Sequence, residues 1–94
     1  MKEFSDNIIN KTDLDFFRYC QGQYGINRGV YNTIENWFYN KKIEEITVRR
    51  KYVLQFLQFV YGDQKGTGKL GKGKVSDNLH QFWSTINNHA EIIK

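Results

Sequence analysis

Residues 24–36, which read YGINRGVYNTIEN, decide the fold that the sequence predicts. Gly25 can adopt the left-handed backbone conformation that ends a helix abruptly. Asn27 is suited to cap a following helix, because its side chain can accept a hydrogen bond from a free backbone N–H. Val30 and Ile34 then begin an apolar stripe with helical spacing. The stretch therefore predicts a helix, a tight turn and a second helix.

The composition of the whole chain favours helices. It contains 94 residues, of which 16% are aromatic and none is proline. A chain of this length suits one domain with a thin core, and a few large aromatic side chains can fill such a core. Proline breaks helix interiors, so its absence removes one obstacle to helix formation. We therefore expect an all-α single-domain bundle of four to five helices over residues 1–94.

Capping residues and apolar spacing give the expected helices their limits. The first is a short opening helix that includes Phe4, Ile8 and Ile9. The second covers 13–23 and is capped by Thr12, and its inward residues are Leu14, Phe17, Cys20 and Tyr24. The others cover 28–41 and 48–61, the latter apolar on most sides, and the last begins at Ser76 or Asp77. The helix over 48–61 is expected at the centre of the bundle. Its start remains open between Thr47 and a point near Glu44.

The segment 63–75 contains four glycines and four lysines and offers little to bury. This composition predicts a flexible basic loop before the last helix. The segment does not match the phosphate-binding loop motif, in which a glycine and four intervening residues are followed by glycine, lysine and Ser or Thr. Contact with a nucleic-acid backbone and a plain surface connection both remain open for it.

The net charge of +4 is unevenly distributed along the chain. Residues 1–46 carry six Lys/Arg against seven Asp/Glu, a balance of −1, whereas residues 47–94 carry eight against three, a balance of +5. A basic second half is typical of a surface that binds a polyanion. The alternative interpretation is that the lysines keep an aromatic-rich small protein in solution.

Nothing in the sequence indicates a membrane span or a secretion signal. No apolar run approaches about 18 residues, and the first residues lack an apolar core. Cys20 is the single cysteine, so it has no partner for an internal disulfide. These features predict a cytoplasmic protein, in the host cytosol if the chain is viral, with no membrane partner.

The runs GINR at 25–28, VYNTIEN at 30–36 and NKK at 40–42 resemble the lambda-repressor-like (Cro/C1, or XRE) helix-turn-helix family. The resemblance covers about residues 13–61 and implies binding to operator DNA as a dimer. It places Asn27, Arg28, Gly29, Asn32 and Thr33 at the start and on the exposed side of the recognition helix. The chain departs from the family at Gln21, where a small alanine is usual, and in the added helical turn at 37–39.

Two sets of residues are candidates for contacts with double-stranded DNA. The base-reading set is Asn27, Arg28, Asn32 and Thr33, since Arg and Asn can make paired hydrogen bonds to guanine and adenine. The phosphate-contacting set is Arg49, Arg50, Lys65, Lys69, Lys72 and Lys74. The alternatives are that Asn27 is only a cap, that Arg28 is only a solvated cation, and that a helix start near Glu44 places the two adjacent arginines mid-helix, which weakens the case for a phosphate contact.

Catalytic or metal-binding patterns are absent from the sequence. His80 and His89 are nine residues apart, which is no metal-ligand spacing, and Cys20 has no CxxC partner. No serine, histidine and acidic residue align as a nucleophile set. We therefore expect no enzyme activity, no metal and no cofactor.

Two functional hypotheses follow from these patterns. The first is a small sequence-specific DNA-binding regulator of phage or mobile-element origin, acting as a monomer or homodimer. The alternative is a small non-catalytic protein that inhibits or modulates a larger host protein, such as a nucleic-acid-processing enzyme. In the alternative, Tyr19, Tyr31 and Tyr39 form the interface, because exposed tyrosines are common interface anchors.

Overall fold

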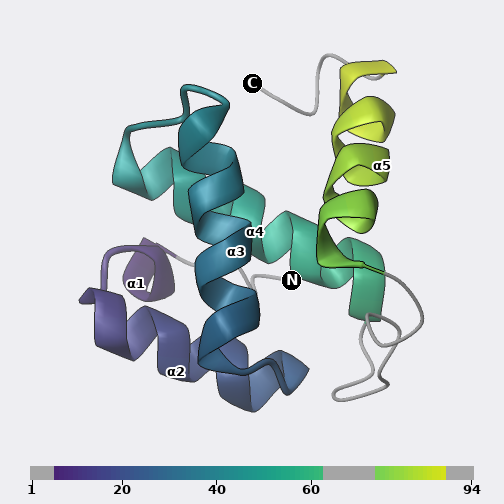
Figure 1. Ribbon diagram of the computed structural model, residues 1–94. Coiled ribbons are helices and arrows are strands. Elements are labelled where there is room, and N and C mark those ends of the chain that lie inside the picture. The colour runs from purple at the N-terminus through teal and green to yellow at the C-terminus, as the bar shows by residue number, and fades with distance from the viewer. Residues whose placement is uncertain (1–5, 63–73, 89–94) are drawn as a thin grey trace.

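The computed structural model describes residues 6–62 and 74–88. Over these ranges the chain forms five helices and no strand (Figure 1). They are α1 (Asp6–Ile9), α2 (Asp13–Tyr24), α3 (Arg28–Asn40), α4 (Ile46–Tyr61) and α5 (Val75–Asn88). The predicted all-α bundle is confirmed. The basic loop was predicted over 63–75; residues 63–73 lie outside the described residues, and α5 begins at Val75, within the predicted loop.

Local signals fix both ends of α2. The hydroxyl of Thr12 accepts a hydrogen bond from the backbone N–H of Asp15, at 3.3 Å, and so caps the start of the helix. Gly25 follows the last helical residue with φ 73°, and its N–H donates to the carbonyl of Gln21. The αL conformation favours glycine and lets the chain turn sharply into α3.

Of the four residues predicted to face inward from α2, Phe17, Cys20 and Tyr24 are buried and Leu14 is not. Phe16 is fully buried, whereas the side chain of Leu14, expected inside, is 48% exposed. Both choices have helical spacing with Phe17 and Cys20, so the spacing cannot separate them. The choice depends on the neighbours, because α2 packs against α1, α3 and α4 at once. The face centred on Phe16, Phe17 and Cys20 is the one that these three helices cover.

The helix α3 begins as predicted. The side-chain oxygen of Asn27 accepts a hydrogen bond from the backbone N–H of Val30, at 2.9 Å. Tyr31, Ile34 and Phe38 are buried against the neighbouring helices. Because α3 packs against α2, α4 and α5, these side chains connect α2 with α5 across the bundle.

The most buried helix is α4, as predicted from its apolar sequence. It begins at Ile46, where the carboxylate of Glu45 accepts a hydrogen bond from the N–H of Val48. It ends at Tyr61 and is followed by Gly62, which has a positive φ of 63°. Its buried apolar residues are Tyr52, Val53, Leu54, Phe56, Leu57, Val60 and Tyr61. They contribute to one core shared with α1, α2, α3 and α5.

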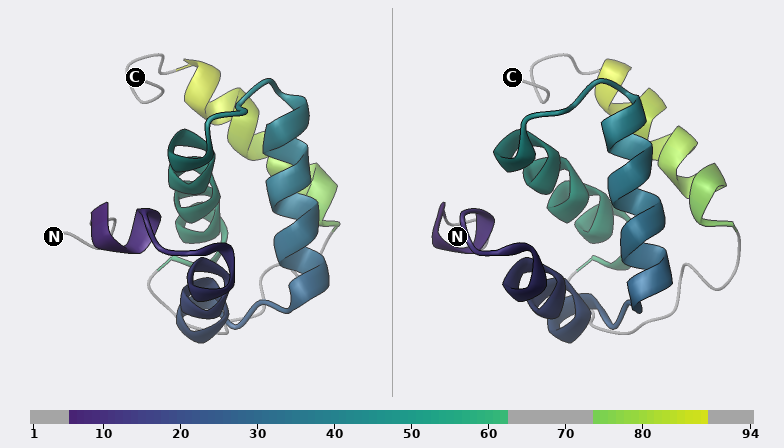
Figure 2. Two further views of the ribbon diagram at one scale, coloured as in Figure 1. Left: turned by 90° about the vertical axis from the view of Figure 1, so that its left-hand side faces the viewer. Right: turned by 60° about the vertical axis from the view of Figure 1, so that its left-hand side comes forward.

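The helices α1 and α2 lie on one side of the α3–α4 pair and α5 lies on the other (Figures 1 and 2). On the α5 side, Leu79, Phe82 and Ile86 are buried. Aromatic rings fill the space between α5 and its neighbours, with Phe38 stacked on Tyr52 and Phe82 at the edge of Phe38. No helix formed by the described residues has the length and apolar character needed to span a membrane.

Candidate nucleic-acid interface

One side of α3 is left uncovered by the bundle. We call it the α3 outward face and define it as Arg28, Asn32, Asn36, Tyr39 and Asn40, all of which are exposed. Positions 28, 32, 36 and 40 form a row, since residues four apart lie on the same side of a helix. The row consists of one cation and three uncharged amides. In the described part of the chain, the three amide side chains make no hydrogen bond to protein.

The α3 outward face carries no carboxylate. The single acidic residue of α3 is Glu35, which is half-buried and turned toward α4. Its Oε2 atom lies 3.2 Å from Nε of Arg49. The negative charge of α3 is therefore paired inside the protein, and the polar groups that α3 presents to solvent are neutral or positive.

The guanidinium of Arg28 lies over aromatic rings of the core. Its central carbon is 4.6 Å from the ring centroid of Phe17 and 5.7 Å from that of Tyr31. A cation in this position is attracted by the negative face of the ring. Arg28 is nevertheless exposed, so the side of the guanidinium that faces away from the rings meets solvent.

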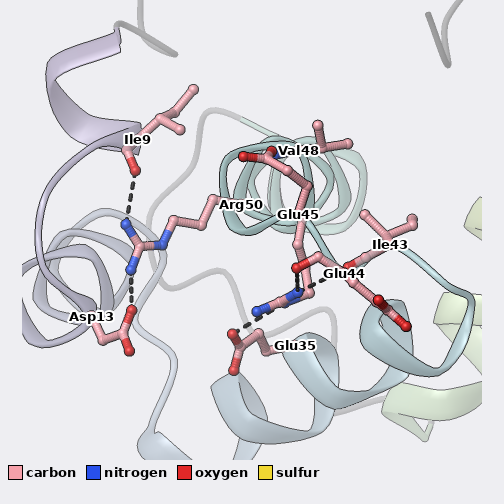
Figure 3. Close-up of polar contacts among 9 residues, drawn as sticks. Ile9, Asp13, Glu35, Ile43, Glu44, Glu45, Val48 and Arg50 are labelled. Carbon is pink, nitrogen blue, oxygen red and sulfur yellow. Dashed lines mark hydrogen bonds and ion pairs between the residues drawn. The ribbon is translucent and has the colours of Figure 1, made fainter.

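Tyr39 is the exposed aromatic residue of α3, with 51% of its surface accessible. The guanidinium carbon of Arg49 lies 5.2 Å from its ring centroid. Arg49 is itself held firmly, because its Nη1 atom donates to the carbonyls of Ile43 and Glu44 at 2.9 and 2.8 Å. Figure 3 shows these carbonyls and Glu35 gathered around one guanidinium. The ring of Tyr39 therefore has a charged, fixed group against one side.

Arg50 points the other way, toward α1 and α2 (Figure 3). It is buried, and its guanidinium donates to the carbonyl of Ile9 at 2.8 Å, to the carbonyl of Lys11 and to the carboxylate of Asp13. This network ties the centre of the bundle to the α1–α2 connection.

These placements correct the predicted phosphate contacts at Arg49 and Arg50. Both side chains are bound within the protein, and the charge of each is paired with a carboxylate. The reason is the start of α4: with Glu45 as the cap, both arginines lie in the second helical turn, where they face the core. Of the two starts that the sequence left open for this helix, the structure adopts the one near Glu44. Lys74 is exposed, whereas Lys65, Lys69 and Lys72 lie outside the described residues.

The remaining predicted residues have diverse surroundings. Asn27 is occupied as the cap of α3, and the hydroxyl of Thr33 donates to the carbonyl of Gly29 at 3.0 Å. Tyr31, predicted at a protein interface, is only 3% exposed and belongs to the core, since it packs against the rings of α2. Tyr19 is half-buried against the core. Of the three predicted interface tyrosines, only Tyr39 is exposed.

Sequence reasoning did not include Asn36 or Asn40 in the base-reading set, and it missed the support of Tyr39 by Arg49. The amide row has a visible signal, because Asn32, Asn36 and Asn40 recur every four residues. The support of Tyr39 has no comparable signal, since Tyr39 and Arg49 belong to different helices. Around this face the described chain adds exposed cations at Lys41 and Lys42, and Nζ of Lys41 lies 4.8 Å from a ring of Trp37.

Comparison with known proteins finds a relative that matches nearly the whole chain. It is the RNA-binding riboflavin kinase RibR of Bacillus subtilis (strain 168), which is 38% identical over 91 aligned residues. The relative is named for RNA, not DNA. The match covers 93% of this chain and 40% of the relative, so the chain spans about two fifths of the relative's length. No family model and no solved structure matches the chain.

This relative overturns several predictions made from the sequence. A DNA-binding transcription regulator of phage or mobile-element origin is contradicted, because the relative is a bacterial protein named for binding RNA. The alternative hypothesis, a small protein that inhibits a larger host protein, also finds no support in the relative's name. The expectation of no enzyme activity is also contradicted, since the relative is named a kinase. The likeness of residues 13–61 to the lambda-repressor-like family stays a prediction.

Proposed function

We propose that this chain binds RNA. The observation that carries the proposal is the 38% identity, over nearly the whole chain, to a protein named as RNA-binding. The relative is also named a riboflavin kinase. That activity is assigned to the whole relative, and this chain matches 40% of its length. Of the two functions in the relative's name, RNA binding is the one that the exposed surface of the described residues supports.

The α3 outward face has the chemistry that RNA contacts require. Phosphates are drawn to cations, and Arg28 at one end with Lys41 and Lys42 beyond the other end supply them. Amide side chains can donate to and accept from base edges, and exposed aromatic rings stack on bases. The absence of a carboxylate from this face also supports the proposal, because an acidic group would repel the phosphate backbone.

The test is a titration of the purified chain with fluorescently labelled structured RNA at about 50 and 200 mM salt. We expect binding that weakens steeply with salt, because cations that replace counterions on the phosphates make affinity salt-dependent. Arg28→Ala should weaken binding more than Lys51→Ala, which removes the same charge from an exposed position on α4. Absence of binding at the lower salt concentration would overturn the proposal.

The kinase activity in the relative's name is measured with the same preparation. The chain is incubated with riboflavin and ATP, and phosphorylated riboflavin is followed by chromatography. Appearance of the product in proportion to the chain would place a catalytic centre in this part of the sequence. RNA binding is measured separately, so the two results do not depend on each other.

A further inference from the structure

We propose that the α3 outward face takes unpaired RNA bases, which stack on Arg28 and Tyr39 and are hydrogen bonded by Asn32 and Asn36. This inference rests on the proposed RNA binding and names the form of RNA that the surface selects. It follows from three features of the face. Two flat groups, the guanidinium of Arg28 and the ring of Tyr39, lie near its ends; each is supported on one side by other side chains of the protein; and amide side chains lie between them.

The two flat groups lie on the same side of α3. Arg28 and Tyr39 are eleven residues apart, which is close to three full turns of a helix. At 1.5 Å per residue, their positions are separated by about 16 Å along the helix axis. Both side chains are exposed. A strand of RNA lying along α3 therefore meets both groups on one face.

Each flat group is held from beneath by the protein. The guanidinium of Arg28 rests over the ring of Phe17, at 4.6 Å from the centroid, while its outer side meets solvent. The ring of Tyr39 has the guanidinium of Arg49 on one side, and Arg49 is fixed by Glu35 and two carbonyls. Such backing lowers the entropy lost when a base stacks on the outer side. Arginine guanidinium planes and aromatic rings are the groups on which proteins stack unpaired bases.

Asn32 and Asn36 can form hydrogen bonds to bases only where the base edges are accessible. Asn32 and Asn36 are exposed, rise about 6 Å from one to the next along the helix axis, and make no hydrogen bond within the described residues. In an RNA duplex the major groove is deep and narrow, and side chains cannot read the base edges there. In loops, bulges and single strands the edges are open. The minor groove of the duplex is accessible, but it is recognised mostly through its shape, 2′-hydroxyls and phosphates. An uncharged amide row on a helix therefore fits unpaired bases better than a duplex.

The experiment compares two RNAs of equal length and composition at one salt concentration. One is a hairpin with a large unpaired loop, and the other is a fully paired duplex. We expect the hairpin to bind the wild-type chain at least tenfold more tightly. Tyr39→Ala should weaken hairpin binding by about tenfold or more, because one stacked base contributes that much on average. Tyr39→Phe keeps the ring and should stay within about twofold of the wild type.

Asn36→Ala tests the amides and is paired with Asn87→Ala, which removes an exposed asparagine from α5. Only Asn36→Ala should weaken hairpin binding, and neither change should alter duplex binding. Thermal unfolding of each variant, followed by circular dichroism, shows that the fold is kept. Equal binding of hairpin and duplex, or full hairpin binding by Tyr39→Ala, would overturn this inference and leave RNA binding in place. Failure of both RNAs to bind would overturn the proposed function itself.

Discussion

The guanidinium of Arg49 binds the carboxylate of Glu35, with 3.2 Å between Nε and Oε2. This pair joins α3 to α4 and removes from the α3 outward face the acidic side chain that α3 carries. It also fixes the guanidinium against which the ring of Tyr39 rests. One ion pair therefore contributes both to the packing of two helices and to the character of the proposed RNA-binding surface.

Breaking this pair should lower stability. Glu35→Gln keeps the shape of the side chain and removes its charge, which leaves a nearly buried Arg49 without its counterion. We expect the free energy of unfolding to fall by about 1–3 kcal/mol, measured by urea denaturation. The control is Glu44→Gln, in which an exposed carboxylate is changed and a loss within about 0.5 kcal/mol is expected. Equal losses in the two variants would contradict the assigned role of Glu35.

Replacing Arg50 should loosen α1. Its guanidinium donates to the carbonyls of Ile9 and Lys11 and to the carboxylate of Asp13, so Arg50→Ala leaves these acceptors without a donor. The expected loss is about 1–3 kcal/mol, since the buried carbonyl of Ile9 loses its donor, whereas the carboxylate of Asp13 is 77% exposed and is solvated. Amide hydrogen exchange at residues 8–11 should accelerate more than exchange in α5. Uniform acceleration along the chain would argue against a local role.

The inward face of α2 gives a direct comparison of two apolar positions. Phe16→Ala should reduce the free energy of unfolding by about 3–5 kcal/mol, because it removes a fully buried ring and leaves a cavity. Leu14→Ala should change it by no more than about 0.5 kcal/mol, since Leu14 is 48% exposed. Both values come from urea denaturation. The reverse order would mean that Leu14, as predicted from the sequence, and not Phe16, faces the core.

Two asparagines near the start of α3 should separate stability from binding. Asn27→Ala removes the cap of α3 and should cost about 1 kcal/mol of stability. Asn32→Ala changes an exposed side chain within the helix and should leave stability nearly unchanged while weakening binding to unpaired RNA. Thermal unfolding and RNA titration on both variants measure the two effects. A large stability loss in Asn32→Ala would indicate a structural role for that residue.

The protein should lose stability above about pH 9. Burial raises the pKa of the Cys20 thiol from 9.0 to about 12, and burial together with the charge of Glu35 raises the pKa of Tyr31 from 10.0 to about 12. Below pH 9 both groups are neutral in the folded and unfolded states, so their contribution to stability is fully present. As the pH rises toward 12, the unfolded chain releases these protons first, and unfolding becomes more favourable.

Each such group lowers the free energy of unfolding by up to about 1.4 kcal/mol per pH unit above its unfolded pKa. Urea denaturation at pH 8 and pH 10.5 measures the fall. The fall should be smaller in Cys20→Ala, which lacks one of the two groups. The same stability at both pH values would contradict the assigned burial of these side chains.

Much of the helical structure was predictable because it depends on nearby residues. The caps at Thr12 and Asn27 bond to residues three positions ahead, and Gly25 provides the positive φ of the turn between α2 and α3. The central position of α4 followed from its apolar residues on nearly every side. The exposed position of Arg28 and Asn32 on α3 also followed from the helical period.

The sequence by itself therefore determined that the helices form, the caps at Thr12 and Asn27 and the turn at Gly25, because these depend on backbone hydrogen bonds and on side chains within one or two turns. The tertiary structure alone decided that Phe16 and not Leu14 enters the core, that Arg49 and Arg50 are paired with carboxylates, and that Tyr31 is buried while Tyr39 lies against a fixed cation. These outcomes depend on contacts between residues ten to forty positions apart. Helical spacing gives the direction of a side chain around its own axis, and only the packed neighbours decide whether core or solvent lies in that direction.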